Sequence, residues 1–359
     1  MRCCVLKKPG CIEIVEVADP EPGSGDLVIR VRAALTCGTD LKAYRRGHPK
    51  MPCPTRFGHE FSGEVVAAGS EVDGFAVGEA VMSANTGPCG HCFYCRHEQE
   101  NLCETIMQEM ILGAYGEYLR IPARVVRNNV YRKPDELSFE QAALLEPLSS
   151  VCHGAACLPE TTENAVILGT GPVALLWLLV LKRRGLGPIA VAGRRPEKLA
   201  IAEALGADAA VIADERLEDA VGEIGAGHGP DAVIECTGAP EVWQRACGLV
   251  RRGGSVVLFG GCAQGTEVRL DTYRLHYDGV RIASPFHFRP VDVRAAYELL
   301  RGGLDGASDL IDANVGLDAV PRLFAAMAAG RPEGIAGRIK TAVLPQRSAG
   351  GPVPGGPTR

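Results

Sequence analysis

Residues 165–174 read AVILGTGPVA, in which four apolar residues lead into a Gly-x-Gly-x-x-Ala turn and then into a longer apolar stretch. This order predicts a strand, a tight turn and a helix. Gly169 permits the turn, Gly171 lets an anion approach the backbone, and Pro172 fits the first helical turn, where a backbone N–H has no partner to lose. Because the positive end of the helix faces the turn, the stretch predicts a dinucleotide pyrophosphate site that also includes Val173.

The residues that follow continue this alternation of strands and helices. Strands are predicted at 165–168, 189–192, 209–212, 232–235, 255–259 and 280–284, with helical patterns in four of the gaps. The alternation predicts an α/β fold with a doubly wound parallel sheet. Thr237, which follows the fourth of these strands, is also expected to bind the cofactor.

The end of the second predicted strand indicates which nicotinamide cofactor is preferred. Sites that prefer NAD place an aspartate or glutamate there to bind the ribose 2′-hydroxyl, whereas this chain has Gly193 followed by Arg194 and Arg195. A missing carboxylate and two guanidinium groups favour a 2′-phosphate, and therefore NADP over NAD. The alternative is that the two arginines are a solvated pair at the start of a helix.

A different pattern fills the N-terminal part of the chain, from residue 3 to about residue 84. Short β-branched runs alternate there with Gly and Pro, as is typical of antiparallel strands. The clearest of these runs lie at 12–17, 27–32 and 63–67. The two patterns meet near residues 148–163, where Pro and Thr interrupt both. Residues 1–150 and 151–285 are therefore expected to form separate domains.

The C-terminal part adds a few further elements. Helices are predicted at 291–301 and around 319–329, and a short strand is predicted near 339–344. Residues 345–359 are rich in Gly and Pro, so we expect a disordered tail.

The composition restricts the class of protein. The chain has 359 residues, 46% hydrophobic and 23% charged, which is typical of a globular protein with about two domains. Its 43 acidic residues outnumber its 38 basic residues, so no nucleic-acid partner and no anionic membrane is expected. The apolar runs are too short to span a bilayer, and the first residues do not form a signal peptide. We therefore expect a cytoplasmic protein.

Four cysteines lie close together in one segment. Cys89, Cys92, Cys95 and Cys103 have spacings of two, two and seven residues, which suit a tetrahedral zinc ion with no open position. His91 lies inside this segment but is surplus to a complete ligand set. The alternatives are buried cysteines without a metal, a redox pair, which would need a βαβ setting that is absent here, and an iron–sulfur cluster. A closed site of four thiolates predicts a structural zinc.

A second group of metal-ligand residues is spread along the N-terminal half. Cys37, the pair His59 and Glu60, and Glu146 offer a thiol, an imidazole and carboxylates, the ligand types of a catalytic zinc that keeps one position free. Taken singly, a cysteine or histidine is more often a core residue. Glu146 lies in apolar sequence just before Pro147, and its alternative is a helix-end residue that reaches solvent.

These two groups and the glycine-rich turn, in this order along residues 1–344, resemble the zinc-dependent medium-chain alcohol and polyol dehydrogenases. The resemblance implies a GroES-like, β-rich catalytic domain, formed by residues 1–150 and completed by 286–344, with a Rossmann domain at 151–285 inserted between them. The Glu-Pro-Leu sequence at 146–148 is similar to the sorbitol dehydrogenase branch. The family also implies a homodimer or homotetramer built by continuing a sheet across subunits.

The resemblance further implies which residues hold the catalytic metal. Cys37 and His59 bind the zinc in this family, together with either Glu60 or Glu146, and the choice between the two glutamates stays open. With the four-cysteine segment, this implies two zinc ions per subunit.

The resemblance also implies a route for the substrate proton. Thr39 matches the hydroxyl that relays the proton, but the next relay position, commonly a histidine, is Lys42 here. His48 is either a substitute in the relay or an exposed structural histidine. Lys340, in the sequence GRIK at 337–340, matches a basic residue that contacts the cofactor pyrophosphate.

The expected reaction is hydride transfer between NAD(P) and a secondary alcohol of a polyol, cyclitol or amino sugar. Segments 274–277 and 285–287 are similar to those of aminocyclitol (2-deoxy-scyllo-inosamine) dehydrogenases of aminoglycoside antibiotic biosynthesis. The alternatives are a general polyol or threonine dehydrogenase, a zinc-free NADPH-dependent carbonyl or enone reductase, and a nucleic-acid-binding zinc protein, whose basic surface is missing. Cys152, Cys157 and Cys236 are expected to be packing residues.

Overall fold

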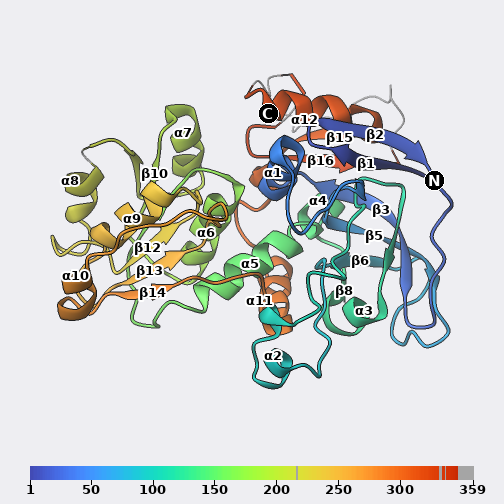
Figure 1. Cartoon of the computed structure of the whole chain (residues 1–359), viewed down its shortest axis with the longest axis horizontal. Helices are drawn as coiled ribbons and strands as arrows, with labels where there is room; N and C mark the ends of the chain where they lie inside the picture. Colours follow the sequence, from blue (N-terminus) through green and yellow to red (C-terminus); the bar gives the residue numbers. More distant parts are fainter. Residues whose placement is uncertain (216, 331–333, 336, 347–359) are drawn as a thin grey trace. The chain divides into compact units, whose positions relative to one another are not determined.

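The structure, a computed structural model, describes residues 1–359 except 216, 331–333, 336 and 347–359 (Figure 1). The chain forms two compact units. Unit 1 contains Met1–Glu146 and the described residues from Ile311 onward, and unit 2 is Pro147–Leu310. Residues 286–310, expected from the sequence in the catalytic domain, therefore group with unit 2. Beyond Gln346, the expected disordered tail lies outside the described residues.

Unit 2 is built on a six-stranded parallel sheet with the order β11-β10-β9-β12-β13-β14. The strands are β9 (Ala165–Leu168), β10 (Ile189–Gly193), β11 (Ala209–Ile212), β12 (Ala232–Glu235), β13 (Ser255–Leu258) and β14 (Arg281–Ala283). All six predicted strands are present, which confirms the doubly wound fold. The strand order reverses between β9 and β12, and such sheets bind ligands beyond the carboxyl ends of the strands at this point.

The helices of unit 2 connect these strands or flank them along the chain. They are α5 (Leu145–Ala155, which begins in unit 1), α6 (Pro172–Arg183), α7 (Pro196–Ala204), α8 (Leu217–Gly222), α9 (Pro240–Leu249), α10 (Thr272–Tyr277) and α11 (Pro290–Arg301). A proline opens α6, α7, α9 and α11, where its fixed φ angle suits the first turn. The central helix α6 is apolar on nearly every face because it is buried, and its Trp177 is fully covered.

Unit 1 contains two sheets. One has the order β2-β1-β4, and the other has the order β15-β16-β3-β5-β6-β8, with β7 paired to β3. The strands are β1 (Arg2–Lys8), β2 (Cys11–Glu16), β3 (Leu27–Leu35), β4 (Thr55–Arg56), β5 (Glu60–Ala68), β6 (Ala80–Ser83), β7 (Tyr118–Ile121), β8 (Val130–Arg132), β15 (Ile311–Gly316) and β16 (Lys340–Leu344). Strand β15 was not expected from the sequence. Because β16 pairs with β3, the C-terminal part of the chain completes a sheet that begins near the N-terminus.

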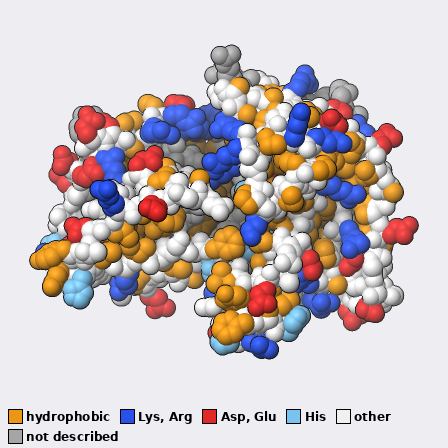
Figure 2. All heavy atoms as spheres, in the orientation of Figure 1, with side chains coloured by type: hydrophobic (Ala, Val, Ile, Leu, Met, Phe, Trp, Pro, Cys, Tyr) orange, Lys and Arg blue, Asp and Glu red, His pale blue; other side chains and the backbone are white. Residues whose placement is uncertain are grey.

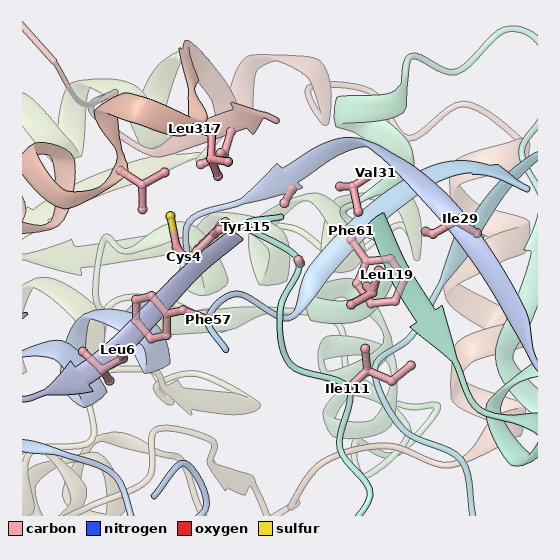
Figure 3. Close-up of a cluster of buried hydrophobic side chains, with 14 of the residues drawn as sticks. Cys4, Leu6, Ile29, Val31, Phe57, Phe61, Ile111, Tyr115, Leu119 and Leu317 are labelled. Carbon is pink, nitrogen blue, oxygen red and sulfur yellow. The ribbon is translucent and has the colours of Figure 1, made fainter. Parts of the chain in front are cut away.

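Short helices and an aromatic core complete unit 1. The helices are α1 (Gly38–Arg46), α2 (Phe93–Arg96), α3 (Ala123–Asn129), α4 (Phe139–Ala142) and α12 (Val320–Ala328). Figure 3 shows part of the core, in which Phe57, Tyr115 and Leu317 come from three distant segments. The Phe57 ring lies 5.6 Å from Tyr115 and 5.1 Å from Phe324, measured between ring centroids. Among the described residues of both units, no helix is long and apolar enough to cross a membrane.

Candidate active site

The four-cysteine segment brings all its sulfur atoms together. The Sγ atoms of Cys89, Cys92, Cys95 and Cys103 lie within 4.8 Å of one another, and none of these cysteines is in a disulfide. The backbone N–H groups of Cys89 and Cys92 donate to Cys103 Sγ and Cys89 Sγ, each at 3.4 Å. Such bonds stabilise thiolates, and backbone bonds lower the pKa of Cys92 to about 6. The donor set therefore fits a structural zinc ion, and His91 bonds to a backbone carbonyl instead.

The second group of ligands forms where β3, α1 and β5 meet. Cys37 caps the N-terminus of α1, and His59 and Glu60 lie at the start of β5. Pairing of β3 with β5 places Glu60 opposite Leu35, which ends β3 two residues before Cys37. One donor atom from each of Cys37, His59 and Glu60 lies within 4.8 Å of the others, and His59 and Glu60 are buried.

A buried carboxylate and a tyrosine hold the imidazole of this group. His59 Nδ1 lies 2.9 Å from Asp40 Oδ1, so the carboxylate accepts the Nδ1 proton and Nε2 keeps its lone pair for a metal. Tyr115 donates its hydroxyl to the other oxygen, Asp40 Oδ2, at 2.7 Å, and also to the Leu35 carbonyl at 3.0 Å. Neither Asp40 nor Tyr115 was singled out from the sequence. Asp40 follows Thr39 directly, but no local signal links it to a residue 75 positions away.

Glu60 has one bonded and one free carboxylate oxygen. Its Oε2 accepts a bond of 2.5 Å from Lys340 Nζ, which also donates to the Thr36 carbonyl at 3.0 Å. Its Oε1 is buried and has no hydrogen-bond partner among the described residues. A buried acceptor without a donor is costly, and beside a thiol and an imidazole this oxygen fits a metal ion. Lys340, which the sequence predicts at the cofactor pyrophosphate, is buried in this group.

Glu146 belongs to the same buried environment but not to the three-donor group. It lies in the first turn of α5 and is 8% exposed. Burial raises its pKa to about 7, helped by Glu60, against the opposing effects of His59 and Lys340. The structure thus places Glu60 with Cys37 and His59, and it leaves Glu146 as a further carboxylate of the same cluster.

The expected proton-relay residues lie on α1 or just after it. Thr39 is half-buried, and its N–H donates to Cys37 Sγ at 3.4 Å. Lys42 is exposed one turn further along the helix, and His48 follows the helix in a half-buried position. No hydrogen bond joins Thr39, Lys42 and His48 directly within the part of the chain that the structure describes.

The glycine-rich turn of unit 2 has the backbone that a phosphate site requires. Gly169 has a φ angle of +126°, which favours glycine, and a Cβ there would lie 3.4 Å from Cys236 and Thr237. Gly171 caps α6, and a Cβ there would face open space. Pro172 and Val173 then open the helix, so its N-terminal N–H groups are available to an anion.

The neighbouring strand ends complete this part of unit 2. A Cβ at Gly193 would lie 2.5 Å from the Thr170 side chain, so the position has no room for an acidic residue without a shift. Arg194 and Arg195 are exposed beyond β10, and Arg195 forms an ion pair with Glu197 at 3.9 Å. Thr237 follows β12 and its N–H donates to the Glu235 carboxylate at 2.6 Å.

The two units together define a class of protein. Unit 1 holds a buried thiol, imidazole and carboxylate that fit a catalytic metal, and it holds a separate site of four thiols. Unit 2 is a doubly wound sheet with a glycine-rich phosphate turn at its switch point. This combination is that of a metal-dependent oxidoreductase that uses a nicotinamide dinucleotide.

Comparisons with known proteins agree with this class. The family model of the alcohol dehydrogenase GroES-like domain matches residues 23–135, and that of the zinc-binding dehydrogenases matches residues 172–301. L-threonine 3-dehydrogenase from Shewanella halifaxensis is 30% identical over 333 residues, which cover 91% of this chain and 96% of the relative. L-threonine 3-dehydrogenase from Klebsiella pneumoniae is 30% identical over 335 residues, with the same coverage.

Solved structures show the same similarity. A chain from Sinorhizobium meliloti, assigned to the zinc-binding dehydrogenases and bound to NADP, has a TM-score of 0.85 and 29% identity, covering 96% of this chain and 99% of its own. The alcohol dehydrogenase of a Thermus species has a TM-score of 0.87 and 27% identity, covering 96% of this chain and all of its own. The chain therefore belongs to the zinc-dependent medium-chain alcohol dehydrogenase family. It is an oxidoreductase that acts on CH–OH groups with NAD(P).

Proposed function

We propose that this enzyme transfers a hydride between NADP and a secondary alcohol of a polyol, cyclitol or amino sugar, with one catalytic and one structural zinc per subunit. The observation that carries the proposal is the buried group of Cys37, His59 and Glu60, in which Glu60 Oε1 has no partner among the described residues. The Glu-Pro-Leu sequence at 146–148 supports the polyol branch, and segments 274–277 and 285–287 support a cyclitol substrate in antibiotic biosynthesis.

The roles of the chain's own residues follow from their contacts. When bound, zinc would supply Lewis acidity at the substrate oxygen and the nicotinamide would supply the hydride acceptor. Asp40 fixes the orientation of His59, and Lys340 offsets the charge of Glu60. The alcohol loses one hydride and one proton as it becomes a ketone, and the resemblance to the family assigns the Thr39 hydroxyl to carry the proton away.

A second candidate substrate is L-threonine, because several relatives at about 30% identity are named L-threonine 3-dehydrogenase. The C3 hydroxyl of threonine is also a secondary alcohol. Formation of reduced nicotinamide from sorbitol, myo-inositol, an aminocyclitol, L-threonine and ethanol separates the candidates. Turnover of ethanol alone would contradict the proposal, and turnover of L-threonine alone would select the second candidate.

The NADP preference rests on Arg194 and Arg195, which are exposed at the end of β10, and on the absence of an acid at Gly193. The double variant Arg194→Gln/Arg195→Gln should raise the KM for NADP about tenfold to a hundredfold and leave the KM for NAD unchanged, because only NADP carries the 2′-phosphate. An equal rise in the KM for NADP and for NAD would show that the arginines do not bind the 2′-phosphate.

We also propose a homodimer or homotetramer that assembles through the β14 edge of the unit 2 sheet. Large apolar side chains are exposed along this edge and on α10, namely Tyr273, Tyr277, Ile282 and Phe286. Figure 2 shows hydrophobic side chains gathered over α10. Size-exclusion chromatography with light scattering tests this: an oligomer that the variant Ile282→Asp dissociates is expected, and a monomeric wild type would contradict it.

A further inference from the structure

One segment beside the catalytic residues has an unusual charge. Residues 41–59 contain five Lys or Arg residues and two histidines but no Asp or Glu, although the whole chain has a net charge of −5. The segment begins directly after Asp40 and ends at His59. Positive charge is therefore concentrated on α1 and in the segment that leads from α1 to the start of β5.

Three of these cations lie on one side of α1 or just beyond it. Lys42 and Arg46 are four residues apart and share a helix face, and Cys37 caps the N-terminus of the same helix. Helical side chains generally lean toward the helix N-terminus, and Cys37 lies at that end of α1. Lys50 follows in the loop, and its N–H donates to His48 Nδ1 at 3.2 Å.

The pKa of the histidine in this segment is affected by the same cations. Partial burial lowers the pKa of His48, and the positive charges of Lys42, Arg46 and Lys50 lower it further. The imidazole therefore lies close enough to the three exposed cations for their charges to affect it.

Nearby groups that could neutralise the cations are already occupied. Asp40 accepts bonds from His59 and Tyr115, and Glu60 accepts one from Lys340. Among the described side chains, none forms an ion pair with Lys42, Arg46 or Lys50. Arg45 differs because it donates to the carbonyls of residues 327 and 328 at the end of α12, at 3.1 and 2.8 Å.

We propose that Lys42, Arg46 and Lys50 form an anion-binding site beside the catalytic ligands, and that this site recognises a phosphate or carboxylate group on the alcohol substrate. Adjacent cations without counter-charges repel one another, and an oxyanion relieves that repulsion while it accepts charge-assisted hydrogen bonds. This inference rests on the proposed function and narrows it to secondary alcohols that carry an anionic group, such as polyol phosphates or hydroxy acids. The pyrophosphate of the cofactor is the other source of the same chemistry.

Binding of inorganic phosphate tests the site without turnover. Calorimetry uses the zinc-loaded enzyme with saturating NADP, so that the cofactor occupies its own phosphate sites. We expect phosphate to bind the wild type and to bind Lys42→Gln/Arg46→Gln at least about tenfold more weakly. The matched control Arg294→Gln/Arg301→Gln removes two exposed charges from α11 and should bind phosphate like the wild type.

The alternative outcomes are distinct. Phosphate binding that disappears when NADP is present would assign the cations to the cofactor and overturn recognition of the substrate. Unchanged affinity in the Lys42→Gln/Arg46→Gln variant would overturn the site itself. Circular dichroism checks that the Lys42→Gln/Arg46→Gln variant is folded. If that variant does not fold, Lys50→Gln, which lies outside α1, replaces it in the titration.

Turnover then separates this inference from the proposed function. The ratio of kcat/KM for sorbitol 6-phosphate to that for sorbitol should exceed about ten in the wild type and fall toward one in the double variant. Equal values for both substrates in the wild type would overturn the anion site while the proposed function stands. If no secondary alcohol is oxidised, the proposed function fails, and the phosphate titration alone decides whether the anion site exists.

Discussion

The catalytic group of unit 1 and the phosphate turn of unit 2 are assembled in opposite ways. In unit 2 the phosphate turn lies within one continuous stretch, from the end of β9 to the start of α6. In unit 1 the catalytic group joins distant segments, as in the bond of Lys340 to Glu60, which are 280 residues apart. Substitutions in the phosphate turn of unit 2 should therefore affect mainly cofactor binding. A single substitution at the catalytic group of unit 1 should affect metal binding, proton transfer and stability together.

The largest effect is expected for Cys37→Ser in the three-donor group of unit 1. Loss of this thiolate should remove one of the two zinc ions expected from the two ligand groups. Activity should fall about a thousandfold, because the metal contributes several kcal/mol to stabilising the transition state. Metal analysis and steady-state kinetics check this, with Cys157→Ser, an exposed thiol of unit 2, as the control. Full activity in the Cys37→Ser variant would show that Cys37, His59 and Glu60 do not hold a catalytic zinc.

The next effect is expected for Cys95→Ser, which breaks the locally built metal site of unit 1. The loop should lose its zinc, and the free energy of unfolding of unit 1 should fall by about 3–5 kcal/mol. Calorimetry should show an earlier transition for unit 1 and an unchanged one for unit 2. A variant with normal zinc content and unfolding temperature would argue against a four-thiolate site.

Tyr115→Phe tests the long-range support of His59. The ring keeps its packing against Phe57, but Asp40 Oδ2 loses the hydroxyl donor that lies 2.7 Å away. Zinc affinity should fall about tenfold to a hundredfold, as is typical when a group behind a metal ligand is lost. Competition with a chelator measures it. Tyr44→Phe, in the same aromatic core, should bind zinc normally, and equal affinities in the two variants would contradict the role of Tyr115.

The smallest effect is expected in unit 2 for Asp231→Asn. Burial would raise the pKa of Asp231, but the N–H groups of Glu163 and Asn164 and the guanidinium of Arg251 outweigh it and hold the pKa below its ordinary value. Ionised Asp231 therefore stabilises the fold at neutral pH, and this contribution is lost as the pH falls below about 4. The variant should be about 1–3 kcal/mol less stable at pH 7.

Chemical denaturation at neutral and acid pH checks this last prediction. The stability difference between wild type and Asp231→Asn should narrow steadily on acidification. A difference that stays constant down to pH 2 would show that Asp231 acts through packing and not through its charge.

The contrast between the units also explains what the sequence could predict. The strands of unit 2 and the cysteine spacing are local patterns, so the six strands and the close approach of the four sulfur atoms were predictable. The contacts of Asp40 with Tyr115 and of Glu60 with Lys340 depend on how β3 pairs with β5, β7 and β16, and no local pattern encodes that pairing. Strand β15 was not predicted, although its alternation of apolar residues with Asp312 and Asn314 is the pattern of a half-buried strand and could have found it.

The central claim is that this chain oxidises a secondary alcohol through a zinc site in unit 1. The most direct test measures reduced nicotinamide formed from the alcohol panel by zinc-loaded, chelator-treated and zinc-restored enzyme. Chelation should abolish turnover, and added zinc should restore it. Undiminished turnover by metal-free enzyme, or reduction of a carbonyl or enone by NADPH without zinc, would contradict the claim and select the zinc-free reductase alternative.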